Sequence, residues 1–287
     1  MSDQVLLARP VPADVRILAK ITAGLGRGLR FSRLAYGPRL SRLGELVVTT
    51  PHGFDIVVDP TDHIGWSVLV SRSYEAPLSR LLKRLLNPGD VFVDVGANHG
   101  WFSLLAASLV GATGKAIAFE PQAKISNRLR TSASLNRFNN LLVRSQAVGD
   151  REMSASIVCP DPLNSGLVHV EADESSSQLS VRPLDDLLTD TTPALIKIDV
   201  EGYEARVLDG MTRLLSTRTL KHIVIEVHPA LLQHYEASES AVAHRLRSRG
   251  YTLYEIRPRL DSAGEPVIIQ LPDDANSLPH HLLATLR

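Results

Sequence analysis

The sequence predicts an α/β protein with a doubly wound, mostly parallel β-sheet. Short and almost wholly apolar segments, such as VFVDV at 91–95, alternate along the chain with segments whose apolar residues recur at helical spacing. A strand that is apolar on both faces needs cover on both faces, and helices on each side of a parallel sheet provide it. Several of these strands also end in acidic or small residues, at the edge where such sheets bind ligands.

The individual elements follow in chain order from these patterns. Two alternating β-rich runs around a Pro-His-Gly turn predict a hairpin at 44–60. A stripe of leucines predicts a helix over 73–90, capped by Ser73 and ended by a Pro-Gly pair. The segments 251–260 and 266–271 are expected to close the sheet as an antiparallel pair. The remaining strands are predicted at 91–95, 115–120, 140–147, 194–202 and 222–229, and the remaining helices at 100–110, 121–137 and 204–215.

The predicted domain organisation has two parts. Residues 1–72 are expected to form a basic helical arm and the hairpin, and residues 73–287 the ligand-binding domain. Within the arm, residues 12–34 predict one or two basic helices that pack on the domain or on a second copy in a homodimer; a helix lying on a membrane surface is the alternative. An irregular insert at about 149–183 predicts either solvated hairpins or a lid over the ligand site.

Composition narrows the class of partner. The 31 Lys and Arg residues balance 31 Asp and Glu residues, so no global positive field favours a nucleic acid. No apolar run approaches the roughly 20 residues that a membrane span needs, and the N-terminus lacks the apolar core of a secretory signal. The single cysteine, Cys159, excludes an internal disulfide and fits a reducing compartment. We therefore expect a cytoplasmic protein with no integral membrane segment and a small-molecule ligand.

The glycine-containing turn after the VFVDV segment is the main signal of a ligand. Gly96, Ala97 and Gly100 lack bulky side chains, so a ligand can approach the backbone, and the following helix start offers N–H groups. Asn98 stands where a dinucleotide fingerprint has its middle glycine, which disfavours a pyrophosphate. Glu120, at the tip of the next strand, can accept both hydrogen bonds of a ribose diol. This pattern favours S-adenosylmethionine (SAM) over NAD; an NAD-dependent oxidoreductase and a non-catalytic interaction module with this fold remain the alternatives.

Four further polar residues are expected at the same edge of the sheet, and we take all four as candidate catalytic residues. Side chains two positions apart on a strand share one face, so Asp199 and Glu201 are expected to project together, as are Glu226 and His228. The strand that carries Asp199 is expected in the middle of the sheet, which places these groups at the rim of the cofactor pocket. The alternative is structural: Lys197 pairs with one acid and the other acids cap helix N–H groups.

The chain resembles the FkbM-type SAM-dependent methyltransferases in six segments that occur in the family's order. They are FVDVGANHGWFSLLAA, AFEPQ, QAVGD, LDDLL, IKIDVEGYEARVLDG and IEVHP, within residues 90–230. The resemblance implies a class I methyltransferase, Rossmann-like fold with a seven-stranded sheet whose last strand pair is reversed. It also implies methylation of an alcohol oxygen, often on a sugar or a secondary metabolite. SAM would be bound by Asp94, Gly96, Asn98 and Gly100, with Glu120 on the ribose and Gln146 and Ala147 near the adenine.

The acceptor hydroxyl must lose a proton during methyl transfer. His228 is a candidate general base because imidazole titrates near neutral pH, and Asp199 is the second candidate or the group that orients the acceptor. In a rival scheme, Asp199, Glu226 and His228 hold a divalent cation that lowers the pKa of the acceptor hydroxyl. Tyr74 and Glu75 are expected either to fold over the pocket or simply to begin a helix.

Overall fold

The computed structural model describes residues 9–11, 42–160, 164–166, 168–173, 179–275 and 277–286. The predicted basic helices at 12–34, and the homodimer contact expected of them, lie outside the described residues. Within the described part of the chain, no helix has the length and apolar character needed to cross a bilayer.

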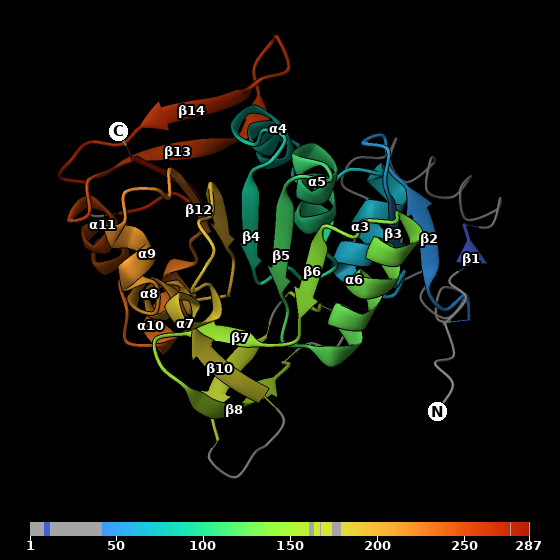
Figure 1. Ribbon diagram of the computed structural model, residues 1–287, viewed down its shortest axis with the longest axis horizontal. Helices are drawn as coiled ribbons and strands as arrows, with labels where there is room; N and C mark the ends of the chain where they lie inside the picture. The colour runs from blue at the N-terminus through green and yellow to red at the C-terminus, as the bar shows by residue number, and fades with distance from the viewer. Residues whose placement is uncertain are drawn as a thin grey trace.

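The central sheet confirms the predicted α/β architecture (Figure 1). In the described residues it has eight strands in the order β14-β13-β15-β12-β11-β4-β5-β6. The five strands from β12 to β6 are parallel, and β15, β13 and β14 continue the sheet in antiparallel pairs. The strands are β4 (Val91–Val95), β5 (Lys115–Phe119), β6 (Leu141–Arg144), β11 (Leu195–Ile198), β12 (His222–Glu226), β13 (Tyr251–Leu260), β14 (Pro266–Gln270) and β15 (His281–Leu286).

The sheet has one strand more than the seven expected. The predicted antiparallel pair β13 and β14 is confirmed, but β15 lies between β12 and β13 and was missed. Its sequence, HLLATL, is rich in leucine and alanine, which locally favour helix. The strand forms because both of its edges are paired and its residues 282–284 are buried, so tertiary packing overrides local propensity.

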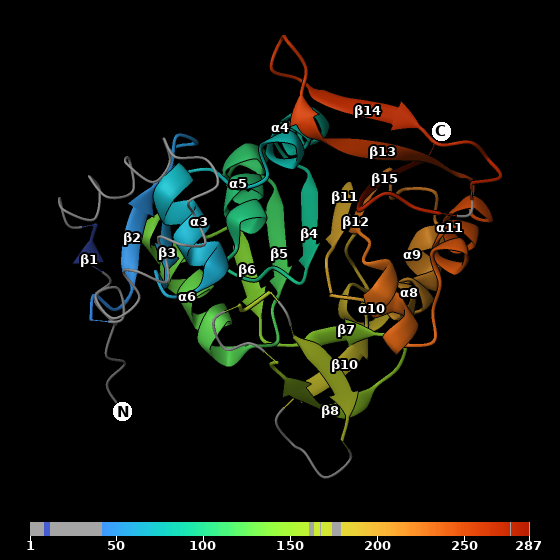
Figure 2. The ribbon, with the colours of Figure 1, turned by 180° about the vertical axis from the view of Figure 1, so that it is seen from behind.

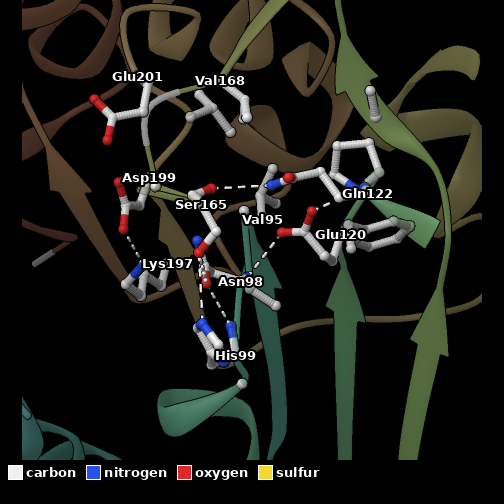
Figure 3. A pocket seen from close by; sticks show the side chains of 18 of the residues that line it. Val95, Asn98, His99, Glu120, Gln122, Ser165, Val168, Lys197, Asp199 and Glu201 are labelled. Atoms are coloured by element: carbon white, nitrogen blue, oxygen red, sulfur yellow. Dashed lines mark hydrogen bonds and ion pairs between the residues drawn. The ribbon is translucent and has the colours of Figure 1, made fainter. Parts of the chain in front are cut away.

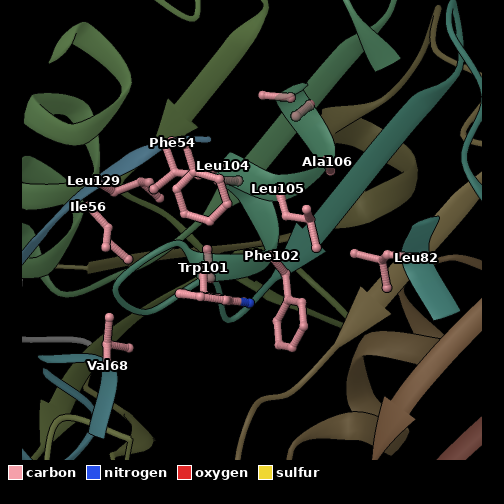
Figure 4. Close-up of a cluster of buried hydrophobic side chains, with 14 of the residues drawn as sticks. Phe54, Ile56, Val68, Leu82, Trp101, Phe102, Leu104, Leu105, Ala106 and Leu129 are labelled. Atoms are coloured by element: carbon pink, nitrogen blue, oxygen red, sulfur yellow. The ribbon is translucent and has the colours of Figure 1, made fainter. Parts of the chain in front are cut away.

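Helices cover both faces of the sheet (Figure 2). Successive strand residues alternate between two separate cores: Phe92 belongs to the core with α3 to α6, and Val93 to the core with α7 to α11. In the first core, Trp101 packs edge-on against Phe54 of the hairpin (Figure 4). The helices are α3 (His63–Ser71), α4 (Ala76–Leu85), α5 (Trp101–Val110), α6 (Ala123–Leu135), α7 (Leu184–Leu187), α8 (Glu204–Asp209), α9 (Thr212–Ser216), α10 (Pro229–His234) and α11 (Glu239–Arg247).

Two predicted helices differ in their boundaries. The helix expected from residue 73 begins at Ala76, and its N-cap is Glu75 in a left-handed conformation rather than Ser73. The helix expected over 204–215 is divided into α8 and α9 at Gly210. A Cβ at Gly210 would lie 1.8 Å from the carbonyl oxygen of Gly149, so the close approach of a neighbouring strand accounts for the glycine there.

The predicted insert forms a small sheet of its own beyond β6 (Figure 1). Its strands pair in the order β7-β10-β8-β9, around a small apolar core that includes Ala155 and Val181. In the part that is described, the insert forms antiparallel strand pairs around this core, and the choice between hairpins and a lid stays open. The strands are β7 (Ala147–Gly149), β8 (Met153–Val158), β9 (His169–Ala172) and β10 (Leu179–Pro183).

The predicted N-terminal hairpin is confirmed as β2 (Leu46–Thr49) and β3 (Asp55–Val58), with β1 (Arg9–Pro10) parallel to β2. A buried arginine is one of the side chains that connect it to the main domain. Arg128 of α6 lies 2.6 Å from the Glu45 carboxylate and 2.9 Å from the Asp59 carboxylate, and only 4% of its side chain is exposed. The hairpin is thus joined to the domain through a buried charge. Water cannot reach this charge to replace a lost carboxylate partner.

We expect Arg128→Met to lower the free energy of unfolding by about 2–4 kcal/mol, because the substitution leaves the partly buried Glu45 carboxylate without its cation and Asp59 with only an exposed one. Lys124→Met is the matched control: Lys124 also pairs with Asp59, at 3.7 Å, but its side chain is 75% exposed. Such an exposed pair contributes about 0–1 kcal/mol. Urea unfolding of both variants measures the difference, and equal costs would contradict a structural role for Arg128.

Candidate active site

A cavity of about 980 Å³, part of it open to solvent, lies at the carboxyl ends of the central strands (Figure 3). This is the edge at which the sequence places the ligand. The insert closes part of the cavity, through Ser165, Gly166, Val168 and Val170. The sequence-predicted residues that line it are Gly96, Ala97, Asn98, Gly100, Glu120, Gln146, Ala147, Asp199, Glu201 and Glu226; Asp94 and His228 are not part of the lining.

The glycines of the turn after β4 are required by the protein's own packing. Gly96 has φ +81° and Gly100 has φ +84°, a region that favours glycine. A Cβ at Gly96 would lie 1.8 Å from the carbonyl oxygen of Asp199, and one at Gly100 would lie 2.0 Å from Leu129. These glycines were expected to make room for a ligand; the atoms nearest to their missing Cβ positions belong to the chain itself.

Glu120 lies at the tip of β5 and connects two segments of the cavity wall. Its Oε2 accepts the backbone N–H of Asn98 at 2.8 Å, and its Oε1 accepts that of Gln122 at 2.9 Å. Burial raises the pKa of Glu120 to about 7, although these backbone N–H groups pull it down. Each oxygen keeps a further lone pair for a ligand hydroxyl.

A buried lysine lies beneath the centre of the cavity. The Lys197 ammonium is 2.8 Å from Asp199 and 3.9 Å from Asp94, and it lies over the ring of Phe102. Burial lowers the pKa of Lys197, but Asp199 and Asp94 outweigh that effect and hold it above its ordinary value. The structural alternative, in which Lys197 pairs with one of the acids, is therefore correct for Asp199.

Asp94 is buried below the cavity rather than exposed in it. It is 1% exposed, and its Oδ2 accepts a hydrogen bond from Ser103 Oγ at 2.6 Å. Burial raises its pKa, and Lys197 opposes that rise. In this structure Asp94 contacts Lys197 and α5, and its predicted contact with a cofactor stays a prediction.

A hydrogen-bonded hub around Asp62 was not predicted from the sequence. Asp62 caps α3 through Oδ1, which also lies 2.9 Å from His99 Nε2, while its Oδ2 accepts the backbone N–H of Ser165. Ser165 Oγ contacts Asn98, and its carbonyl accepts from Gln122 (Figure 3). The hub joins α3, the turn after β4 and the insert, so it fixes the insert over the cavity.

Asp62 remains ionised in this setting. Burial raises its pKa, but hydrogen bonds from His99 and the backbone outweigh that effect and hold the pKa well below its usual range. The sequence did contain a signal for the cap, since Asp62 directly precedes a helical segment. Its partners His99 and Ser165 lie 37 and 103 residues away in sequence, which no local pattern can indicate.

The acidic residues after β11 and β12 meet at one end of the cavity, as expected. His228 Nε2 lies 3.4 Å from Glu226 Oε1 and 3.6 Å from Glu201 Oε2. The hydrogen bond to Glu226 raises the pKa of His228, against the effect of burial. Burial and the nearby Asp199 raise the pKa of Glu201 to about 7. Tyr74 also lines this region, and Glu75 is the N-cap of α4, so the two alternatives for this pair, a place at the pocket and a helix start, both hold in part.

Two histidines at this end were missed by the sequence analysis. His280 Nε2 lies 2.8 Å from Glu226 Oε1, and His281 Nε2 lies 3.6 Å from Glu226 Oε2. Burial raises the pKa of Glu226, but hydrogen bonds from the three imidazoles, those of His228, His280 and His281, outweigh it and bring the pKa far below its ordinary value. His281 begins β15 and His280 directly precedes it. Because this strand was not predicted, neither histidine was placed at this edge of the sheet.

Comparison with known proteins gives the family. Residues 94–253, more than half of the chain, match the family model described as the methyltransferase FkbM domain. The chain belongs to the FkbM methyltransferase family. The class I methyltransferase fold and the SAM cofactor expected from the resemblance are thereby confirmed, with eight strands in the sheet instead of seven.

Individual relatives are distant. The FkbM chain is 27% identical over 160 residues to the hexuronic acid methyltransferase AglP of Haloferax volcanii, covering 54% of this chain and 62% of AglP, less than two thirds of its length. It is 24% identical over 193 residues to a protein-L-isoaspartate O-methyltransferase of Triticum aestivum, covering 64% of this chain and 80% of that protein. A solved SAM-dependent O-methyltransferase of Thermotoga maritima has a TM-score of 0.41 and 10% identity, covering 84% of this chain and 77% of that chain.

The residues of the cavity fit SAM. Apolar side chains, among them Val95, Phe119 and Val148, line the cavity along with polar groups, as sites for nucleosides require. Glu120 offers acceptor oxygens where hydroxyl donors of a ribose need them, and Asp199 offers a carboxylate further along the wall.

The Asp62 hub generates a prediction about the insert. We expect Asp62→Asn to speed tryptic cleavage at Arg151 and to weaken SAM binding about tenfold, because loss of a charged buried acceptor costs about 1.5–3 kcal/mol and releases Ser165. Ser238→Ala is the control, since it removes the exposed N-cap of α11, a helix with no residue among those that line the cavity. Proteolysis followed by mass spectrometry, with calorimetry of SAM binding, measures both effects. Equal behaviour of the two variants would contradict the hub.

Proposed function

We propose that the protein transfers the methyl group of SAM to a hydroxyl oxygen of a sugar or another small molecule. The observation that carries this proposal is the arrangement of the cavity: a carboxylate, Glu120, at one strand tip and a carboxylate–imidazole cluster around Glu226 and His228 at another. Bound SAM supplies an electrophilic methyl group. The chain must hold the cofactor, orient the acceptor and take up its proton.

We assign cofactor binding to the turn after β4, to residues at the ends of β5 and β6, and to Asp199 after β11. Glu120 would accept the two hydroxyls of the ribose, and Gln146 and Ala147 would border the adenine. The backbone N–H of Asn98 donates a hydrogen bond to Glu120, and this bond fixes the turn next to that carboxylate. Asp199 would accept a hydrogen bond from the amino group of the methionine tail. The hydrogen bond from Lys197 fixes the orientation of the Asp199 carboxylate.

His228 is the better of the two candidate bases on geometry. Asp199 is committed to Lys197 at 2.8 Å, so its carboxylate is already neutralised by a buried cation. His228 lies between Glu201 and Glu226, which both line the cavity although His228 does not, and 31% of its side chain is exposed. Glu226 and Glu201 then orient the imidazole, and Glu226 lines the cavity itself.

A hydroxyl acceptor is favoured over a carboxylate by this cluster. A carboxylate acceptor needs no base, and several acids at the acceptor end would repel it. Relatedness to a protein named as a hexuronic acid methyltransferase supports a sugar as the substrate class. An NAD-dependent oxidoreductase is disfavoured by membership of a methyltransferase family, and a non-catalytic module leaves the clustered acids and histidine without a role.

The proposal is tested with methyl-labelled SAM and a panel of hexoses, hexuronic acids and simple alcohols. We expect a methyl ether as the product, identified by NMR, with His228→Asn lowering kcat by about 100-fold or more and leaving SAM affinity unchanged. His244→Gln, an exposed histidine on α11, is the control and should keep full activity. A methyl ester, or full kcat in the His228→Asn variant, would overturn the proposed chemistry.

Glu120 gives SAM binding a defined pH dependence. Because its pKa is about 7 in the free protein, Glu120 is mostly protonated at pH 6 and mostly ionised at pH 8. The ionised form is the better acceptor for two hydroxyls, so affinity should rise by up to about tenfold from pH 6 to pH 8. Calorimetry with S-adenosylhomocysteine measures this rise. Glu120→Gln should bind more weakly and lose most of the pH dependence; an unchanged slope in that variant would exclude Glu120 as its source.

A further inference from the structure

We propose that Glu226, His280 and His281 bind a divalent first-row transition metal ion at the acceptor end of the cavity. Each of the three offers one ligand atom, and these atoms lie within 4.8 Å of one another. This set differs from the one considered from the sequence, which combined Asp199, Glu226 and His228. Asp199 is committed to Lys197, whereas the two histidines of the new set both point a ring nitrogen at Glu226.

The three side chains are held by paired backbone. Glu226 ends β12 and His281 begins β15, and the two residues are directly opposite partners in the antiparallel ladder. His280 is fixed next to them, because its carbonyl accepts the backbone N–H of Val227 at 2.7 Å. A ligand set built on neighbouring strands changes little in geometry on binding, which favours a metal site.

The distances suit coordination. Ligand atoms about 2.0–2.1 Å from a tetrahedral zinc ion lie about 3.3 Å from one another. Three separations lie near this value: 2.8 Å from Glu226 Oε1 to His280 Nε2, 3.6 Å from Glu226 Oε2 to His281 Nε2, and 3.5 Å from His281 Nε2 to Glu75 Oε2. The ligand atoms of Glu226, His280 and His281 all lie within 4.8 Å of one another, so small side-chain adjustments complete the set.

The second nitrogen of His280 is also placed as metal sites require. Its Nδ1 lies 3.3 Å from the carbonyl oxygen of Val227. A carbonyl can only accept, so this contact puts a hydrogen on Nδ1. Nε2 faces the Glu226 carboxylate and donates a hydrogen bond to it, and a metal ion would displace that second hydrogen on binding. Metal-binding histidines typically donate their other N–H in this way.

Two buried atoms next to the cluster, His281 Nε2 and Glu75 Oε2, make no hydrogen bond among the described residues, although they lie 3.5 Å from each other as an ion pair. Leaving such a polar atom unsatisfied costs about 1–3 kcal/mol. Glu75 moreover has φ +39°, a conformation that is rare for residues other than glycine. Strain and unsatisfied polar atoms coincide at one point, where coordination to a cation would offset both.

The local charge favours a cation as well. Four carboxyl groups gather at this end beside three histidines and one lysine, and the lysine is already paired with Asp199. Buried carboxylates need cations, and a divalent ion supplies two charges at once. The four are Glu75, Asp199, Glu201 and Glu226.

The donor set selects the class of metal. The set consists of two imidazoles and one carboxylate, with Glu75 as a fourth ligand. Zinc, manganese, iron(II) and cobalt accept such a mixed set, whereas magnesium and calcium prefer ligands that are all oxygen atoms. Because Glu226 lines the cavity, the ion would lie where it can orient an acceptor hydroxyl. That role rests on the proposed function, whereas the binding itself does not.

Direct titration of tag-free protein tests the site. The protein is stripped with a chelator and titrated with Co²⁺, followed by its visible absorption, and with Zn²⁺ and Mg²⁺ by calorimetry. We expect one Co²⁺ or Zn²⁺ per chain and tighter binding of Zn²⁺ than of Mg²⁺. His281→Gln and Glu226→Gln should weaken Zn²⁺ binding by at least about 100-fold, the upper end of the cost of losing an outer partner. His244→Gln is the control and should bind as the parent does.

Titration of the same samples with S-adenosylhomocysteine separates the two proposals. Protein that binds this ligand but neither Co²⁺ nor Zn²⁺ overturns the metal site alone; protein that binds the metal but not the ligand overturns the proposed function alone. Preference for Mg²⁺, or full Zn²⁺ affinity in both variants, also overturns the site. If His281→Gln does not fold, His280→Gln replaces it, because the His280 side chain is 50% exposed and outside the strands.

Discussion

The ion pair between Lys197 and Asp199 fixes the centre of the site. Lys197 lies on β11, between β4 and β12, and its ammonium is buried within reach of Asp94 on β4. A lysine is stable there only with carboxylates beside it, since an uncompensated buried charge costs several kcal/mol. The pairing directs Asp199 along the cavity wall and holds Asp94 below its floor. Glu226 and His228 lie on the other side of β11, and we propose that they meet the acceptor.

The Asp62 hub gives the cavity its second wall. In a plain doubly wound sheet, the carboxyl edge is open to solvent. Here one carboxylate binds α3, the turn after β4 and the insert together, through bonds that are almost fully buried. The hairpin reinforces this wall, because Asp59 lies three residues before Asp62, the N-cap of α3, and pairs with Arg128. Parts of the chain that seem peripheral in sequence therefore shape the site.

The sequence predicted the features that depend on local pattern. Strands β4, β5, β11 and β12 are apolar on both faces, and their ends carry the residues that line the cavity, so alternation and position were sufficient. Strand β15 was missed because Leu and Ala favour helix locally, and with it His280 and His281 were missed as neighbours of Glu226. Asp94 was expected to bind the cofactor, but its burial beside Ser103 and Lys197 depends on packing that no local pattern encodes.

The central claim is that adenosine and a methionine tail bind along the carboxyl edge, from β6 to β11. Hydrogen exchange of the full chain with and without S-adenosylhomocysteine tests it most directly. The account predicts slower exchange at 95–101, 119–122, 145–148 and 199–201, the segments that line the cavity, and no such effect of NAD. Protection confined to the opposite edge of the sheet, or none at saturating ligand, would contradict it.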